Sequence, residues 1–321
     1  MRTIVGVALV AAAVASCGGG SSSGSGGGAQ LLSGFDPGPA PDSSKGFQFI
    51  TPIVDNIEPG ASVEYCTWTD TILQHDVYVD ASQGFQSDTG HHIIVYYSMI
   101  HQPPDTHLCS NSEMTEFSYG MPGNGSGQKF VMPGNLATKL PAGAQLIVNH
   151  HYLNAAATTV AHAQSAINVF YADPTKQHTD SGAMIVLDTE LTVPVGASTY
   201  EETCTINRPY QAWMEFPHMH AWGTHITVTH TPAATGMPEQ LFDLDWDPSY
   251  AFDPTPISKR FDPSSPFVFN TGDKINIKCD YMNNTKSAMS FGDEMCVFGV
   301  FTVDANNLGN LECDRGKWGA F

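Results

Sequence analysis

Basic residues are scarce in this sequence. It contains 13 Lys and Arg against 32 Asp and Glu, has a formal net charge of −19, and has no run of basic residues. A polyanion would be repelled by such a chain, so we expect no nucleic-acid partner.

Helical periodicity and long apolar runs are also missing. The apolar run at residues 4–14 is too short to span a bilayer, and no long segment repeats its apolar residues every 3.6 positions. Thirty glycines and 21 prolines interrupt the chain too often for extended helices. Short segments rich in Val, Ile, Tyr and Phe lie between Gly, Pro, Asn and Asp clusters instead, which predicts an all-β fold.

The length of the chain predicts two domains. Residues 46–321 are too many for one ordinary sandwich, and a polar break falls at residues 173–176. We therefore expect two tandem antiparallel β-sandwich (jelly-roll-like) domains, at residues 46–178 and 179–321.

The N-terminal segment has the layout of a bacterial lipoprotein signal. Residues 1–17 combine Arg2, an apolar run and Ala15-Ser16-Cys17, and residues 18–45 are rich in Gly, Ser and Pro. We expect lipidation of Cys17, a linker over residues 18–45 that is flexible at residues 18–28 and stiffer at residues 31–44, and an exported protein that meets the membrane only through its lipid. Gly18 is not acidic, which favours the outer membrane. An ordinary signal peptide with an incidental cysteine is the alternative.

The cysteine spacing argues against a zinc–thiolate site, because no Cys-x-x-Cys pair occurs. With Cys17 set aside, an even number remains in an exported chain, so we expect disulfides. The spacing leaves all 15 pairings open among Cys66, Cys109, Cys204, Cys279, Cys296 and Cys313.

Thirteen histidines are many for this chain, and several stand in pairs. Alternate residues of a strand face one side, so His218 and His220 can meet at one ion. Adjacent residues such as His91 and His92 can share an ion only where the strand bends or bulges. His150 or His151, before Tyr152, could supply a further imidazole.

Met295 adds a different kind of ligand. It stands between Glu294 and Cys296, and its thioether is a soft ligand that favours Cu(I). A set of histidines with one methionine therefore indicates copper more than zinc.

Taken together and in order, these motifs resemble those of the ascorbate-dependent type II copper monooxygenases, the family of peptidylglycine α-hydroxylating monooxygenase and dopamine β-monooxygenase. The resemblance covers roughly residues 62–313. It rests on His91-His92, His151-Tyr152, the entry to the second domain with Asp188 and Pro194, His218-Met219-His220, Cys279-Asp280-Tyr281-Met282-Asn283 and Glu294-Met295-Cys296.

The resemblance implies two copper ions with different tasks. His91, His92 and His151 would hold an electron-storing copper, and His218, His220 and Met295 an O2-activating, catalytic one across a solvent-filled cleft. Ascorbate or an equivalent reductant would supply electrons for hydroxylation of a substrate C–H bond, the substrate being a small or peptide-like molecule. The resemblance also implies three disulfides, Cys66–Cys109, Cys204–Cys313 and Cys279–Cys296.

The chain departs from the peptide-hydroxylating branch at three positions. Phe216, Val297 and Gly299 replace the Arg, Asn and Tyr of that branch. Without a charged partner a substrate carboxylate would be desolvated at a cost, so a glycine-extended peptide is not expected. Trp213 and Trp222 are either part of an aromatic pocket or ordinary core residues. A copper-binding envelope lipoprotein without catalysis, and an adhesion or polysaccharide-binding sandwich, are the alternative functions.

Overall fold

The computed structural model describes residues 30–320, except residues 115, 155, 157, 253–256 and 305–308. The predicted signal segment with Cys17 and the first part of the predicted linker lie outside the described residues. The described residues contain only two short helices, α1 (Asn111–Met114) and η1 (Pro248–Phe252), and neither has the length and apolar character needed to cross a membrane. The remaining regular structure is β-strand, which confirms the all-β prediction.

The first half of the chain forms two antiparallel groups of strands. One contains β1 (Gly46–Ile50), β12 (Ser165–Tyr171), β4 (Val77–Gln86), β8 (Ser126–Val131) and β9 (Leu136–Leu140). The other contains β6 (Asp105–Leu108), β3 (Ser62–Ile72), β10 (Gln145–Leu153), β5 (Gly90–Ser98) and β7 (Ser118–Asn124), in that order. A small pair joins β2 (Val54–Ile57) to β11 (Ala161–Ala163).

The second half repeats this arrangement. One group contains β13 (Thr179–Leu187), β23 (Val297–Val303), β16 (Tyr210–His218), β19 (Lys259–Arg260), β20 (Phe267–Phe269), β24 (Asn310–Asp314) and β25 (Lys317–Ala320). The other has the order β15 (Gly196–Thr205), β21 (Lys274–Asn283), β17 (Gly223–Thr231) and β18 (Glu239–Asp245). β14 (Thr192–Val193) pairs with β22 (Met289–Ser290).

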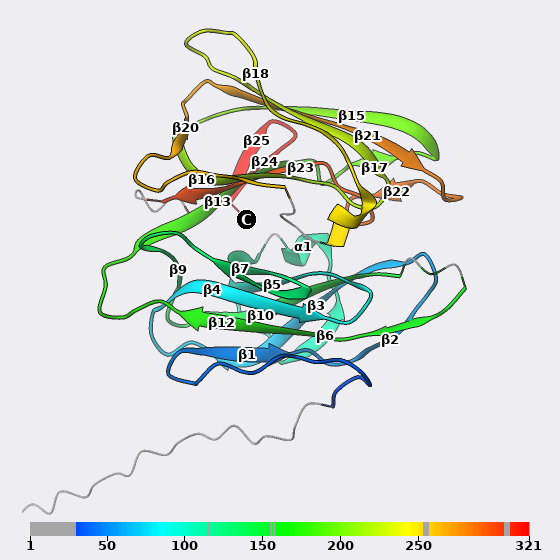
Figure 1. Ribbon diagram of the computed structural model, residues 1–321, viewed down its shortest axis with the longest axis vertical. Coiled ribbons are helices and arrows are strands. Elements are labelled where there is room, and N and C mark those ends of the chain that lie inside the picture. The colour runs from blue at the N-terminus through cyan, green and yellow to red at the C-terminus, as the bar shows by residue number, and fades with distance from the viewer. Residues whose placement is uncertain are drawn as a thin grey trace, which may run out of the picture.

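The two halves are stacked and share a sheet. Strands from β13 onward occupy the upper part of Figure 1, and β1 to β12 the lower part. Parallel pairing of Thr179 with Leu136, and of Asp180 with Ala137, joins β13 to β9 in one 12-stranded sheet. The turn between β12 and β13 falls at the predicted boundary, but because this sheet runs through both halves, the division into two domains stays a prediction.

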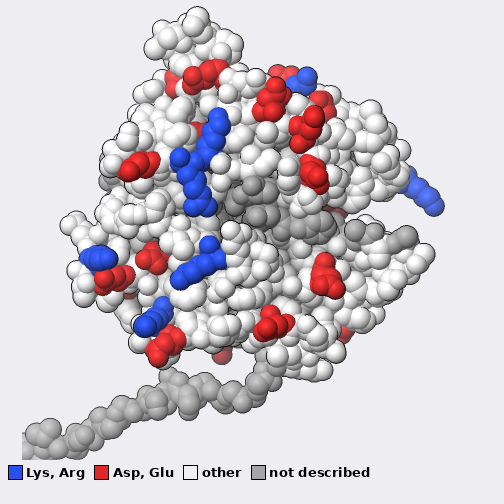
Figure 2. Space-filling view, in the orientation of Figure 1, with Lys and Arg blue, Asp and Glu red and all other residues white. Residues whose placement is uncertain are grey.

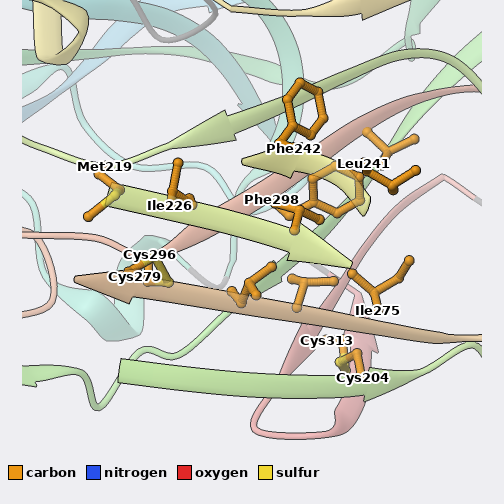
Figure 3. Packing of buried hydrophobic residues seen from close by; sticks show 14 of the residues in the cluster. Cys204, Met219, Ile226, Leu241, Phe242, Ile275, Cys279, Cys296, Phe298 and Cys313 are labelled. Carbon is orange, nitrogen blue, oxygen red and sulfur yellow. A yellow bond between two sulfur atoms is a disulfide. The ribbon is translucent and has the colours of Figure 1, made fainter. Parts of the chain in front are cut away.

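Apolar cores fill both halves and the junction between them. The core of the second half packs side chains of β17, β18, β21 and β23 against one another, among them Ile226, Phe242, Ile275 and Phe298 (Figure 3). A second core joins residues of the first half, such as Ile93 and Val148, to Ala183, Trp213, Met214 and Phe301 of the second. The halves are therefore held together by buried apolar side chains.

Three disulfides tie the strands together. Cys66 is bonded to Cys109, Cys204 to Cys313, and Cys279 to Cys296, as the family resemblance implies. Figure 3 shows the last two bonds among the buried side chains of the core of the second half. Cys279 lies in β21 and Cys296 precedes β23, so this bond fixes the segment that carries Met295.

Residues 30–45, the later part of the predicted linker, are held against the first half of the chain. The first strand begins at Gly46, as expected, but the preceding segment already lies against the sheet. Gln164 accepts a hydrogen bond from Leu32 N at 2.8 Å and donates one to Gln30 O at 2.9 Å, and Asn168 donates one to Pro39 O at 3.0 Å. Side-chain amides of the body therefore hold backbone that the composition alone assigns to a coil.

The charge distribution agrees with the composition. Figure 2 shows acidic side chains scattered over the visible face of both halves, while the few basic ones gather mainly on its left side. Several of the basic groups lie over aromatic rings: Lys129 is 3.7 Å from the ring centroid of Phe170, and Lys259 is 4.8 Å from that of Phe242. These cations thus cover apolar surface of the protein itself.

Glu215 is a buried carboxyl group in β16. It has no solvent exposure, and neither carboxyl oxygen has a hydrogen-bond partner. Burial raises its pKa to about 7, although the charges of Lys259 and His230 oppose the rise. The folded protein therefore holds a proton on Glu215 more tightly than the unfolded chain does.

This carboxyl group predicts a pH-dependent stability. The stability it contributes is complete below the unfolded pKa, roughly 4.3, and is lost as the pH rises through about 7. We expect the free energy of unfolding of Glu215→Gln, taken relative to that of the native protein, to rise by about 2 kcal/mol between pH 5 and pH 8. Urea unfolding at both pH values measures it, with the exposed Glu116→Gln as control. Parallel pH profiles for native protein and Glu215→Gln would contradict the prediction.

Candidate metal centre

Three neighbouring strands carry one part of the centre on a single face of their sheet. In β10, His151 pairs with His92 of β5 on one side and with Glu64 of β3 on the other. Directly opposed residues of antiparallel strands project from the same face with Cβ atoms about 5 Å apart. The three side chains therefore form a row across the sheet.

A bulge in β5 adds His91 to this row. Tyr152 of β10 pairs with Gly90 and His151 pairs with His92, so His91 is the extra residue between them. The ring centroids of His91 and His92 lie 4.6 Å apart, and those of His91 and His151 lie 4.8 Å apart. Two adjacent histidines of a strand can face the same side only where the strand bends or bulges, and this bulge meets that condition.

His150 belongs to the opposite face of β10. Its Nε2 is 2.8 Å from Thr67 Oγ1 and its Nδ1 is 2.9 Å from Tyr152 Oη, so both ring nitrogens have hydrogen-bond partners. His151 keeps one: Nε2 lies 2.7 Å from Ser62 Oγ, while Nδ1 is buried without a partner. Of the two alternatives, His151 is the residue with a nitrogen available to a metal.

The other part of the centre comes from the end of β16. His218 is its last residue, and His220 lies just beyond it in the connection to β17. Their ring centroids are 5.2 Å apart. His220 Nδ1 donates to the carbonyl oxygen of Asp293 at 3.1 Å, which leaves the lone pair on Nε2; that atom is buried without a partner.

Glu294 fixes the backbone around these histidines and Met295. Its Oε1 accepts hydrogen bonds from the amides of His220 at 2.5 Å and Met295 at 3.0 Å, and its Oε2 accepts one from Trp222 at 2.9 Å. The hydroxyl group of Tyr281 donates to Met295 O at 3.1 Å. Glu294, Tyr281 and the disulfide of Cys296 therefore hold the main chain of Met295 beside His220. The side chain of Met295 is half-buried.

The two parts meet at the junction of the halves. The ring centroid of His91 lies 5.5 Å from that of His218 and 4.7 Å from that of His220, and the centroids of His151 and His220 are 5.2 Å apart. Ligand atoms within 4.8 Å of one another form two groups, His91 with His92 and His151, and His91 with His218 and His220. The resemblance implies two sites separated by a solvent-filled cleft; the structure instead brings five imidazoles into one cluster.

Burial favours the neutral form of His91, His151, His218 and His220. The relative exposure of the five residues of the cluster is between 0% and 6%. Burial and the neighbouring imidazoles lower the pKa of His91 and His218 well below its usual range, and burial lowers that of His220 to about 4. Neutral imidazole is the form that binds a metal.

The donor set fits a transition metal. In the five-histidine cluster, nitrogens of His91, His151, His218 and His220 are buried without partners, which is costly unless an ion binds them. His92 Nε2 donates to Asn149 Oδ1 at 3.3 Å, a bond that leaves Nδ1 with the lone pair. Imidazole sets of this kind suit copper, zinc, iron or nickel.

A carboxylate supports the first group. Asn149 Nδ2 donates to Glu64 Oε1 at 2.8 Å, and the same oxygen lies 3.8 Å from His92 Nε2. Burial raises the pKa of Glu64, but its interactions with His92, His151 and Asn149 lower it to about 2. An ionised carboxylate next to a ligating imidazole orients the ring and increases its basicity.

Sequence reasoning did not find Glu64, Asn149 or Ser62. Their partners lie 57 to 89 residues away along the chain, so no local motif joins them. The one available signal is that Glu64 interrupts the apolar strand at residues 62–65 with a charge. Trp246 was also missed; its Nε1 donates to His220 O at 3.0 Å, and its ring meets that of His218 edge-on, with the centroids 6.5 Å apart.

The role of Glu64 gives a testable prediction. Glu64→Gln keeps the size of the side chain but removes the charge next to His92, so we expect the affinity of the first histidine group for metal to fall about 10- to 100-fold. Competition with a chelator of known affinity measures this. The exposed Glu58→Gln, in the same half, is the matched control. An unchanged affinity in Glu64→Gln would show that the carboxylate does not support the ligands.

Two of the departures from the peptide-hydroxylating branch are coupled in space. Phe216 of β16 pairs with Gly299 of β23, and a side chain at position 299 would overlap the ring of Phe216. The ring centroids of Phe216 and Phe301 are 5.3 Å apart. The fully buried Trp213 stacks on Phe301, with a centroid separation of 5.6 Å. Trp213 is thus an ordinary core residue, and the ring of Phe216 fills the space that glycine leaves.

The comparisons with known proteins are sparse. No protein-family model matches the chain, and neither does any curated protein sequence. Among solved structures it is similar to a peptide-N(4)-(N-acetyl-β-D-glucosaminyl)asparagine amidase, at 11% identity and a TM-score of 0.34 over 81% of this chain and 96% of that one. It is also similar to the major capsid protein P2 of bacteriophage PM2, at 10% identity and a TM-score of 0.34 over 81% and 99%. At these scores neither likeness bears on function.

Proposed function

We propose that this protein is a copper-dependent monooxygenase that uses ascorbate or an equivalent reductant and O2 to hydroxylate a C–H bond of its substrate. The observation that carries the proposal is the cluster of five buried histidines, with unpartnered nitrogens, contributed by both halves of the chain. Three of the motifs in which the sequence resembles the type II copper monooxygenases, His91-His92, His151-Tyr152 and His218-Met219-His220, supply the five histidines of this cluster.

The chain's own residues have identifiable tasks in this function. Bound copper would cycle between Cu(I) and Cu(II) and so pass electrons from the reductant to O2. Ser62 and Asn149 orient His151 and His92, and the carbonyl group of Asp293 orients His220. Glu294 and the Cys279–Cys296 bond hold the main chain of Met295 beside His220, which makes its thioether a candidate ligand of the same ion as His218 and His220.

The proposed substrate is uncharged at the end that enters the site. Phe216 stands two residues before His218. Its ring contacts that of Phe301 and fills the space next to Gly299. No arginine replaces the one that the peptide-hydroxylating branch uses, so a carboxylate would lose its hydration without a partner. We propose the cell envelope as the location, through a lipid on Cys17.

A second candidate function is copper binding without catalysis, for storage or delivery. One observation favours it: all five histidines are buried, and the three surface cavities that we describe, of about 630, 190 and 780 Å³, are lined by other residues. A storage site needs no opening for a substrate.

Metal content and oxygen uptake distinguish the two functions. We expect the purified protein to bind two copper ions and to consume O2 with ascorbate in the presence of a suitable amide, amine or aromatic compound. Two bound ions without substrate-dependent oxygen uptake over such a panel would favour storage or delivery. Failure to bind copper tightly would refute both and favour an adhesion or polysaccharide-binding role.

A further inference from the structure

His91 occupies a special place in the histidine cluster. Its ring centroid lies 4.6 to 5.5 Å from those of the other four histidines, two from each half of the chain. Both its Nδ1 and its Nε2 are buried without a hydrogen-bond partner. In the five-histidine cluster it is the one residue with both nitrogens in this state.

The two candidate ligand groups share this residue. His91 is grouped with His92 and His151 of the first half, and also with His218 and His220 of the second. If each ion used a separate set of histidines, one ion would have only two imidazoles, and Met295 would have to supply its third ligand. A ring with two available nitrogens can serve both.

The closeness of the two groups is built into the fold. The apolar core at the junction joins both halves, and β9 pairs with β13. η1 of the second half lies against β5, the strand that carries His91. Moving the groups apart would expose part of this apolar core to water, which is unfavourable.

We infer that His91 bridges two metal ions through its two ring nitrogens, with His92 and His151 completing one ion's imidazole set and His218 and His220 the other's. The inference rests on the proposed function, because it requires that two ions bind. A neutral imidazole has one lone pair and one N–H group, so binding of the second ion releases the N–H proton to solvent and leaves an imidazolate. No electron is transferred in this step.

Magnetic coupling tests the bridge without measuring activity. Two Cu(II) ions joined by an imidazolate couple antiferromagnetically, so the protein loaded with two Cu(II) should lose most of its electron paramagnetic resonance intensity at liquid-helium temperature. Protein loaded with equal amounts of Cu(II) and Zn(II) should show more intensity per copper, because mixed pairs contain only one magnetic ion. His91→Ala should restore the intensity of two isolated Cu(II) ions.

The controls separate failure of the bridge from failure of the proposed function. The exposed His162, outside the cluster, serves as matched variant: His162→Ala should keep the coupled spectrum. Two bound Cu(II) ions with the full intensity of isolated ions would overturn the bridge and leave the proposed function standing. Binding of fewer than two ions would overturn both. Since the mixed-metal measurement uses the native protein, the test does not depend on whether His91→Ala folds.

Discussion

Replacing Met295 by isoleucine is expected to lower ascorbate-dependent oxygen uptake by more than about 100-fold while the protein stays folded. Isoleucine is similar in size but has no sulfur, so it cannot act as the soft ligand that favours Cu(I). The side chain is only half-buried, and its backbone is fixed by Glu294, Tyr281 and the Cys279–Cys296 bond. Stability should therefore change little.

Two measurements are needed to interpret this variant. Oxygen uptake gives the activity, and thermal unfolding of the copper-free protein shows whether the fold has survived. Met282→Ile, at an exposed position in β21, is the matched control and should keep full activity. Retained turnover in Met295→Ile would remove the proposed role of the thioether.

Removing the Cys204–Cys313 bond is expected to cause the largest loss of stability among the three disulfides. This bond encloses 109 residues, compared with 43 for Cys66–Cys109 and 17 for Cys279–Cys296. In the chain-entropy account a longer loop restricts the unfolded chain more, so paired Cys→Ala substitutions should lower the free energy of unfolding by about 5, 4 and 3 kcal/mol respectively.

Denaturant unfolding of the three double variants measures this order, and each variant serves as control for the others. The shortest loop has a second role, because it fixes the segment that carries Met295. We therefore expect Cys279→Ala/Cys296→Ala to lose more copper affinity than the other two pairs, although it loses the least stability. An order of stability losses unrelated to loop length would show that native contacts dominate over chain entropy.

The strand content and the disulfide pattern could be predicted from the sequence, for different reasons. β-Branched and aromatic residues between Gly and Pro clusters specify short strands locally, as at β5, β10 and β17. The pairing of the cysteines is implied by the resemblance to the copper monooxygenase family and agrees with the structure.

The geometry of the metal centre could be predicted only in part. The residue types at positions 91, 92, 151, 218 and 220 indicated a metal, but the bulge that turns His91 toward His92 depends on the pairing of β5 with β10. The merging of the two histidine groups depends on how Trp213 and Phe301 pack against the first half, and no local pattern encodes that. The supporting residues Glu64 and Asn149 depend on contacts between distant strands in the same way.

The near-complete burial of the five imidazoles has a kinetic consequence. Because the five imidazoles are buried, we expect an ion from solution to reach them only after neighbouring side chains, such as Trp246 beside His218, have moved aside. At high copper concentration the rate of uptake should then approach a plateau set by this opening, and release to a chelator should be equally insensitive to chelator concentration. The rate of metal exchange would therefore be set by local opening of the protein where its two halves meet.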